Sequence, residues 1–357
     1  ARNEVNDLLA AHGLENWPVH PICAQNADDP GIATLRNALF AAAQATRQRA
    51  QHGNFRLAVD RAFTLTGVGT VVTGTAAAGR VRVGDTLQLS PSGRSVRVRS
   101  LRVHDRPAET GGAGERIALA LSGIEKHEIN RGAWLHAPAL FAPQTRCAVH
   151  LRVLPQQAAL AHWTPVHVHL GADDVPGRLA LLEGETLPPG SSGLAELQLD
   201  RPVGLLAGDR FVLRDASARR TLAGGEVLDI FPPSRHKRRP ERLALLRTMA
   251  AGSQAEILSQ AAEAALCGVD LTRFALNANL DAEALDALLG EEVTQLIASV
   301  GENMQLGKFA RFSKKGANDV VGQYIHANGK IGVLVYLTCG KAESAAKPEV
   351  LELDRKS

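Results

Sequence analysis

The chain has 357 residues, enough for about two to four domains, and its 45% hydrophobic and 22% charged residues are typical of a globular protein. The formal net charge is only +3, so the whole molecule is not a polycation, and any contact with nucleic acid must come from a local patch. No apolar run approaches the length of a membrane span, and the first residues contain no signal-peptide pattern, so we expect no membrane partner.

The cysteines argue against a zinc site or a disulfide framework. Cys23, Cys147, Cys267 and Cys339 lie far apart and form no Cys-x-x-Cys pair, which predicts free thiols in a reducing cytoplasm. Cys267 falls in an apolar helical stretch and is expected in a core. The chain begins with Ala1 rather than methionine, which we interpret as a sign of a fragment or a processed product.

Residues 1–51 show a helical pattern at both ends. Residues 3–14 and 34–45 place apolar side chains at helical spacing. Between them, WPVHPICAQNADDPGI predicts one short buried strand followed by a loop. One strand and two helices do not make a stable domain, so we interpret this segment as the end of a larger α/β unit.

From residue 52 to about residue 231 the pattern changes to short alternating runs separated by Gly, Pro, Asp and Ser. This pattern predicts antiparallel sandwiches or barrels, and two such units fit, with a break near residues 136–144. Residues 60–75, DRAFTLTGVGTVVTGT, are rich in glycine like a phosphate-binding loop, but they contain no lysine and no helix-forming run follows. Valine and threonine favour strands, so the glycines are expected to mark bends or bulges.

After the basic run SRHKRRPER the pattern is helical again over residues 240–289, as in a winged helix cut short. In the tail, residues 290–357, a helical stretch precedes two alternating runs joined through Asn328-Gly329. That dipeptide is the strongest short signal for a β-hairpin.

Several stretches together resemble the bacterial selenocysteine-specific elongation factor over about residues 1–289. They are FRLAVDRAFTLTGVGTVVTGT, GERIALALSGIEKHEINRGAWL, WTPVHVHLGADDVPGRLALLE and RFVLRDASARRTLAGGEVLDIFPP. The fold class is therefore expected to be mainly β, with two consecutive translation-factor barrels. The resemblance implies four parts, namely a remnant of the GTPase domain, barrel II, barrel III and a partial winged-helix-like domain, and a tail of different character follows them. Their expected bounds are residues 1–51, 52–137, 140–233, 240–289 and 290–357.

The same resemblance implies partners and a site. The family delivers selenocysteinyl-tRNA to the ribosome at a recoded UGA codon, and barrel II holds the aminoacyl end. The residues that match the amino-acid pocket are Asp60, Arg61 and Arg116. His104 lies near them in sequence and is a further candidate for the pocket, but a surface turn is favoured for it. A selenol is ionised at neutral pH whereas a serine hydroxyl is neutral, so permanently charged arginines would favour selenocysteine. From the residues alone, the alternative is a structural ion pair on a barrel surface.

Nucleotide chemistry is expected to be absent. The intact family uses GTP and Mg²⁺, but the sequence contains neither a GxxxxGK[ST] loop nor an NKxD motif, so we expect no cofactor bound by this chain. In the nearest similar stretch, residues 301–309, a phenylalanine stands where Ser or Thr must reach Mg²⁺. Whether the chain is an enzyme therefore stays open.

Other polar clusters have less specific interpretations. His167 and His169 alternate on one strand face, but no third metal ligand is evident nearby, so a polar strand face is favoured over a zinc site. The basic run offers possible contacts with tRNA phosphates, and a solvated linker between domains is the alternative. The residues concerned are Arg235, Lys237, Arg238 and Arg239.

Residues 292–351 resemble the second half of elongation factor Ts, although its long helix and the segment that inserts into the partner GTPase have no counterpart. A natural fusion, an engineered chimera and a composite sequence all fit, and the abrupt junction favours a composite of fragments. Two functions follow: recognition of selenocysteinyl-tRNA for UGA recoding, or docking on elongation factor Tu through the tail. Either factor is expected in the cytoplasm.

Overall fold

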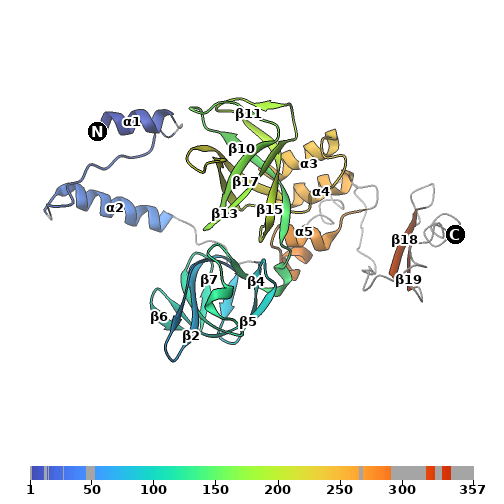
Figure 1. Cartoon of the computed structure of the whole chain (residues 1–357), viewed down its shortest axis with the longest axis horizontal. Coiled ribbons are helices and arrows are strands. Elements are labelled where there is room, and N and C mark those ends of the chain that lie inside the picture. Colours follow the sequence, from blue (N-terminus) through green and yellow to red (C-terminus); the bar gives the residue numbers. More distant parts are fainter. Residues whose placement is uncertain are drawn as a thin grey trace. The chain divides into compact units, whose positions relative to one another are not determined.

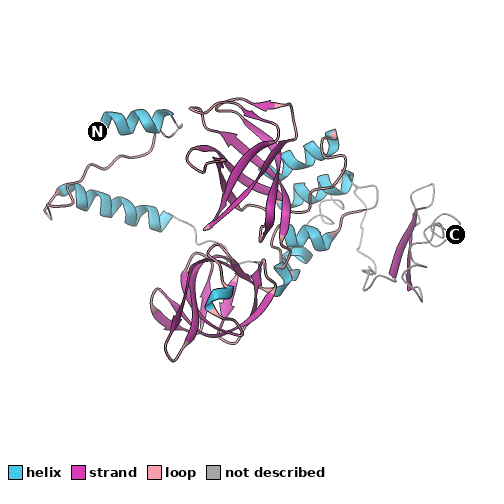
Figure 2. Cartoon of the chain, in the orientation of Figure 1, coloured by secondary structure: helices cyan, strands magenta, loops and turns pink. Residues whose placement is uncertain are grey.

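The computed structural model describes residues 2–11, 14, 16–26, 28–45, 53–264, 268–290, 319–325 and 332–338. The described chain is mainly β, with two barrels and a few helices (Figures 1 and 2). The chain divides into two compact units, residues 1–292 and 293–357. Within the described residues, no helix has both the length and the apolar character needed to cross a bilayer.

The first unit begins with two helices, α1 (Arg2–Ala11) and α2 (Pro30–Ala45). The strand expected between them was a wrong prediction: the described residues from 16 to 29 form turns and coil, and most of their side chains are exposed. A strand needs neighbours to pair its backbone groups, and this segment offers no second strand. Pro18 and Pro21 also remove two backbone donors from it.

The first barrel, which corresponds to the expected barrel II, contains nine strands. Six of them close into a ring in the order β4-β9-β1-β2-β8-β5, because β4 also pairs with β5, and β6 adds to β5. Its interior is filled by small and branched aliphatic side chains such as Leu57, Val72 and Leu119. The strands are β1 (Arg56–Leu65), β2 (Gly69–Ala78), β3 (Arg80–Arg82), β4 (Thr86–Ser90), β5 (Arg94–Val103), β6 (Arg106–Ala108), β7 (Thr110–Gly112), β8 (Arg116–Ser122) and β9 (Trp134–His136).

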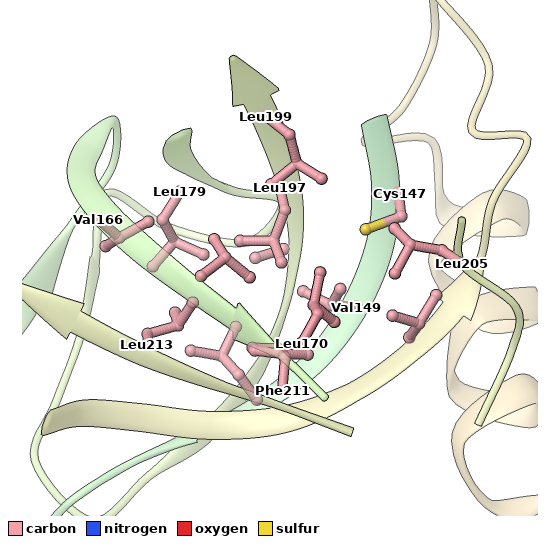
Figure 3. Packing of buried hydrophobic residues seen from close by; sticks show 14 of the residues in the cluster. Cys147, Val149, Val166, Leu170, Leu179, Leu197, Leu199, Leu205, Phe211 and Leu213 are labelled. Carbon is pink, nitrogen blue, oxygen red and sulfur yellow. The ribbon is translucent and has the colours of Figure 1, made fainter. Parts of the chain in front are cut away.

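The second barrel, the expected barrel III, is closed in the order β10-β15-β13-β12-β16-β17. Leucine and valine side chains from these strands point into its interior together with Cys147, as Figure 3 shows. A short pair, β11 with β14, lies outside the ring. The strands are β10 (Gln144–Val153), β11 (Leu160–Ala161), β12 (Thr164–Leu170), β13 (Asp173–Leu181), β14 (Thr186–Leu187), β15 (Ser192–Val203), β16 (Arg210–Asp215) and β17 (Thr221–Asp229).

The predicted helices after the second barrel are present as α3 (Pro240–Ala251), α4 (Gln254–Ala264), α5 (Leu271–Asn277) and helical residues 282–290. Leu246 of α3 is fully buried against Ala148, Leu182, Leu194 and Leu228 of the barrel, so α3 covers one outer face of the second barrel. Cys267, expected in a core, lies outside the described residues.

In the second unit, β18 (Asp319–Ile325) and β19 (Gly332–Thr338) pair antiparallel, as the alternating runs predicted. Asn328 and Gly329 lie outside the described residues.

Candidate functional site

The glycine-rich stretch forms strands β1 and β2 with a tight turn, and not a phosphate loop. Gly67 and Gly69 have φ values of 78° and 97°, in the left-handed region that favours glycine. Further along, the pairing register jumps from Val59 with Gly74 to Arg61 with Thr73, so Asp60 is the extra residue of a β-bulge. A side chain at Gly74 would collide with the backbone of Ala58, 2.0 Å from the position of a Cβ atom. The prediction that these glycines mark bends is confirmed, and the bulged residue itself is Asp60.

The bulge directs the Asp60 carboxylate toward the neighbouring strands. One oxygen of Asp60 accepts a hydrogen bond from the Thr73 hydroxyl at 2.7 Å, and the other accepts one from the Arg116 guanidinium at 2.6 Å. Thr73 lies on β2 and Arg116 begins β8, so the three side chains span the β1-β2-β8 part of the sheet. Thr73 was not identified from sequence, since only its place opposite the bulge distinguishes it from the other threonines.

The charges of this cluster reinforce one another. Partial burial of Asp60 opposes ionisation, but hydrogen bonds from Arg116 and Thr73 outweigh it and hold the pKa of Asp60 below its usual value. The same hydrogen bond raises the pKa of Arg116. The Arg116 side chain stays 50% exposed, so part of its guanidinium faces solvent. Arg61 is exposed, and its charge also favours the ionised form of Asp60.

His104 joins this cluster through its backbone. Its amide donates to the carbonyl oxygen of Arg116 at 3.2 Å, in a turn where His104 and Asp105 both have positive φ. The His104 side chain is exposed. Of the four residues selected from sequence, the structure joins Asp60 and Arg116 by their side chains, places the charge of Arg61 near Asp60, and attaches His104 through its backbone.

The basic run does not behave as one patch. Lys237 donates to Glu196 at 2.8 Å, and the Glu196 side chain is only 1% exposed. Arg238 donates to the carbonyl oxygen of Leu181 at 3.0 Å. The side chains of Arg235 and Arg239 are exposed, and neither forms an ion pair within the described part of the chain.

The two strand histidines have an acidic neighbour that sequence reasoning missed. Asp174 lies 2.9 Å from Nδ1 of His167 and 3.9 Å from Nε2 of His169, because the antiparallel register places Asp174 opposite His169. Asp174 is therefore a neighbouring acidic group that the sequence pattern did not reveal. Even so, the described residues contain no group of three His, Cys, Asp or Glu side chains arranged to hold a metal ion.

Comparison with known proteins finds a match for each of the two barrels. Elongation factor Tu domain 2 matches residues 69–136, and the β-barrel domain of the selenocysteine-specific elongation factor matches residues 145–234. The selenocysteine-specific elongation factor of Escherichia coli strain K12 is 44% identical over 288 residues, which are 80% of this chain and 44% of that protein. The resemblance to selenocysteine-specific elongation factors is confirmed. This chain spans less than half the length of that relative.

A solved structure agrees with this assignment at the level of the fold. The bacterial selenocysteine-specific elongation factor EF-Sec superimposes with a TM-score of 0.64 at 22% sequence identity, covering 78% of this chain and 44% of that chain. The two barrels described above therefore share the fold of the barrels in that solved structure.

The tail matches a different protein, as expected. The elongation factor Ts family matches residues 255–351, and elongation factor Ts of Desulfovibrio desulfuricans is 77% identical over 77 residues, 22% of this chain and 27% of that protein. The family match starts within α4, earlier than the residues from which the resemblance was recognised.

Proposed function

We propose that this chain contains the tRNA-binding barrels of a translation elongation factor that recognises selenocysteinyl-tRNA for UGA recoding. The observation on which the proposal rests is the ion pair between Asp60 and Arg116, formed across β2, with Arg61 beside it. It is supported by relatives that are named selenocysteine-specific elongation factors. The ribosome is the further partner that this function requires.

The pocket would select its amino acid by charge. Asp60 occupies one nitrogen of the Arg116 guanidinium, and an arginine carries five N–H donors, so donors remain for a bound anion. A selenolate would accept charge-assisted hydrogen bonds from Arg116 and Arg61. The neutral hydroxyl of serine would leave the same cations without an anionic partner, and this difference supplies the discrimination.

Asp60 would position Arg116 rather than touch the amino acid. Its lowered pKa keeps it ionised at neutral pH, so the guanidinium is held in place before the ligand arrives. The β-bulge directs this carboxylate toward Arg116, as bulges near functional sites often do. We place His104 at the edge of the pocket, because its backbone is bonded to Arg116.

The basic run would contact tRNA phosphates through its exposed members. Arg235, Arg238 and Arg239 are exposed, whereas Lys237 forms a salt bridge with buried Glu196. We therefore assign the phosphate contacts to the three arginines first. Lys237 would then act mainly as a structural residue of the second barrel.

The GxxxxGK[ST] and NKxD motifs, which bind GTP, do not occur in these 357 residues. The resemblance implies GTP and Mg²⁺ as cofactors of the intact family, and we assign no residue of this chain to them. Docking on elongation factor Tu through the tail is the second candidate. We do not favour it, because the relatives that match most of this chain are selenocysteine-specific factors. A tRNA-delivering factor would act in the cytoplasm.

The test compares the full chain binding to one tRNA charged either with selenocysteine or with serine. We expect tighter binding of selenocysteinyl-tRNA by at least about 10-fold, the value of one charge-assisted hydrogen bond. Elongation factor Tu offered as a bait in the same assay tests the second candidate. Equal affinity for the two aminoacyl-tRNAs would remove the basis of the proposal.

A further inference from the structure

A groove of about 730 Å³ lies on the second barrel, away from the residues assigned to amino-acid recognition. Its walls come from the turn before β12, from strands β13 and β15, and from the segment that leads into α3. The residues important here are His162, Trp163, Glu196, Lys237, Arg238 and Arg239.

The groove contains a stacked pair of rings, His162 and Trp163. Trp163 is 43% exposed, and its indole stacks on the imidazole of His162 with ring centroids 5.8 Å apart. The backbone of Trp163 has φ 71°, which is costly for a bulky side chain. Its amide is fixed there by a 2.7 Å hydrogen bond to the carbonyl oxygen of Leu179. Residues held in costly backbone conformations cluster at functional sites.

The segment between β17 and α3 contributes cationic side chains to the groove. Lys237, Arg238 and Arg239 line the groove, and Glu196 is the single acidic residue among its lining side chains. Glu196 is already bonded to both Arg146 and Lys237, so its charge is neutralised within the barrel. Arg238 lies beside the Trp163–His162 pair, with its guanidinium 3.2 Å from Nδ1 of His162 and 3.5 Å from a carboxylate oxygen of Glu185. Arg239 forms no ion pair within the described part of the chain, so its charge is uncompensated. The groove therefore combines an excess of positive charge with an open aromatic face.

We propose that this groove binds an unpaired nucleotide of an RNA strand, with the base stacked on Trp163 and the adjacent phosphates held by Arg238 and Arg239. Stacking on an aromatic side chain beside cations is how proteins hold single-stranded nucleic acid. An acidic peptide would satisfy the charges, but it would leave the exposed indole face without a partner. The inference rests on the RNA-binding part of the proposed function, because Arg238 and Arg239 are also the residues assigned there to tRNA phosphates, but it does not involve the selectivity for selenocysteine.

The test uses the full chain and a fluorescein-labelled ten-nucleotide oligoadenylate RNA, with binding followed by anisotropy at several salt concentrations. Trp163→Asn removes the stacking face, and asparagine tolerates positive φ, so we expect this variant to keep the thermal stability of the parent chain. We expect its affinity for the RNA to fall about 10-fold, within the usual range for one stacked base. Trp17→Asn, an equal change at another exposed tryptophan, should leave affinity unchanged.

The charge component is tested with Arg239→Gln, which should weaken binding and make it less dependent on salt. Arg219→Gln is the matched control, because Arg219 is exposed on the same barrel but does not line the groove. Equal RNA affinity of the Trp163→Asn variant and the parent chain overturns the proposal. So does a polyglutamate peptide that competes as well as unlabelled RNA, since the groove would then be a general anion surface.

Discussion

Lys237 and Glu196 form a salt bridge of 2.8 Å in which the carboxylate is almost completely buried, although the two residues are 41 positions apart. Arg146 binds the same carboxylate with two hydrogen bonds, at 2.8 and 3.0 Å. The segment after β17 is therefore attached to the second barrel through a shared acid, and is more than a solvated linker.

Replacing Lys237 with methionine should destabilise the second barrel. Glu196 would keep Arg146 but lose one of its two cations, and a buried group that loses a partner costs about 1–3 kcal/mol. The free energy of unfolding in urea measures this loss. Arg235→Met, a similar change at an exposed position of the same run, serves as the control. An equal effect of the two substitutions would show that the salt bridge contributes nothing specific.

The same cluster predicts how stability changes with pH. Burial raises the pKa of Glu196, but hydrogen bonds from Arg146 and Lys237 outweigh it, so its pKa in the folded chain lies below the ordinary 4.5. The stabilisation is fully present above the ordinary pKa and is lost as pH falls through the lowered folded value. Stability measured from pH 7 down to pH 3 should therefore decline less steeply in Glu196→Gln than in the parent chain. Parallel curves would contradict this role for the carboxylate.

Another ion pair, between Arg56 and Asp209, connects the first barrel with the second. Arg56 of β1 contacts Asp209 through two hydrogen bonds of 2.8 Å, and its guanidinium lies 4.0 Å from the centre of the Trp134 ring. The side chains of Arg56 and Asp209 are 7% and 16% exposed, and Arg56→Met removes the cation from the largely buried Asp209 carboxylate, which keeps a hydrogen bond from the Leu206 amide. We expect this loss to cost about 1–3 kcal/mol. Adding Asp209→Asn to that variant should recover part of the loss in a double-mutant cycle. Additive losses would mean that the two residues are not coupled.

Cysteine reactivity should report on the core of the second barrel. Cys147 is fully buried, and burial raises the pKa of its thiol, whereas Cys23 is exposed. In the native chain, iodoacetamide should modify Cys23 but not Cys147, as judged by mass spectrometry of the separate peptides. Cys147 should react once the barrel is unfolded. Rapid native labelling of Cys147 would contradict the packing shown in Figure 3.

The β-barrels were predictable because alternating apolar and polar residues bounded by turn signals specify a half-buried strand locally. The absence of a strand between α1 and α2 was not, because a strand depends on distant partners that no local pattern reveals. The bulge at Asp60 was foreseen only as a bend near glycines. Its exact place depends on the register between β1 and β2, which is a tertiary property.

The candidate site was partly accessible from sequence. Resemblance supplied Asp60, Arg61 and Arg116, and the structure joins Asp60 to Arg116 directly. Glu196 gave no signal, because a single acidic residue within a strand looks like any solvent-facing residue. Its role became visible only when the barrel brought it to Arg146 and Lys237. The sequence of the basic run likewise did not reveal that Lys237 forms a salt bridge with a buried carboxylate while Arg235 and Arg239 stay exposed.

We propose that Arg116 recognises the charged side chain of the bound aminoacyl group. The most direct test measures the affinity of Arg116→Ala for selenocysteinyl-tRNA and for seryl-tRNA, with Arg116→Lys as the variant that keeps the charge. We predict that Arg116→Ala lowers the affinity for selenocysteinyl-tRNA by about 10-fold or more and changes that for seryl-tRNA little, because only the selenolate forms a charge-assisted hydrogen bond. Arg116→Lys should retain part of the preference. An equal loss of affinity for both aminoacyl-tRNAs would contradict the account.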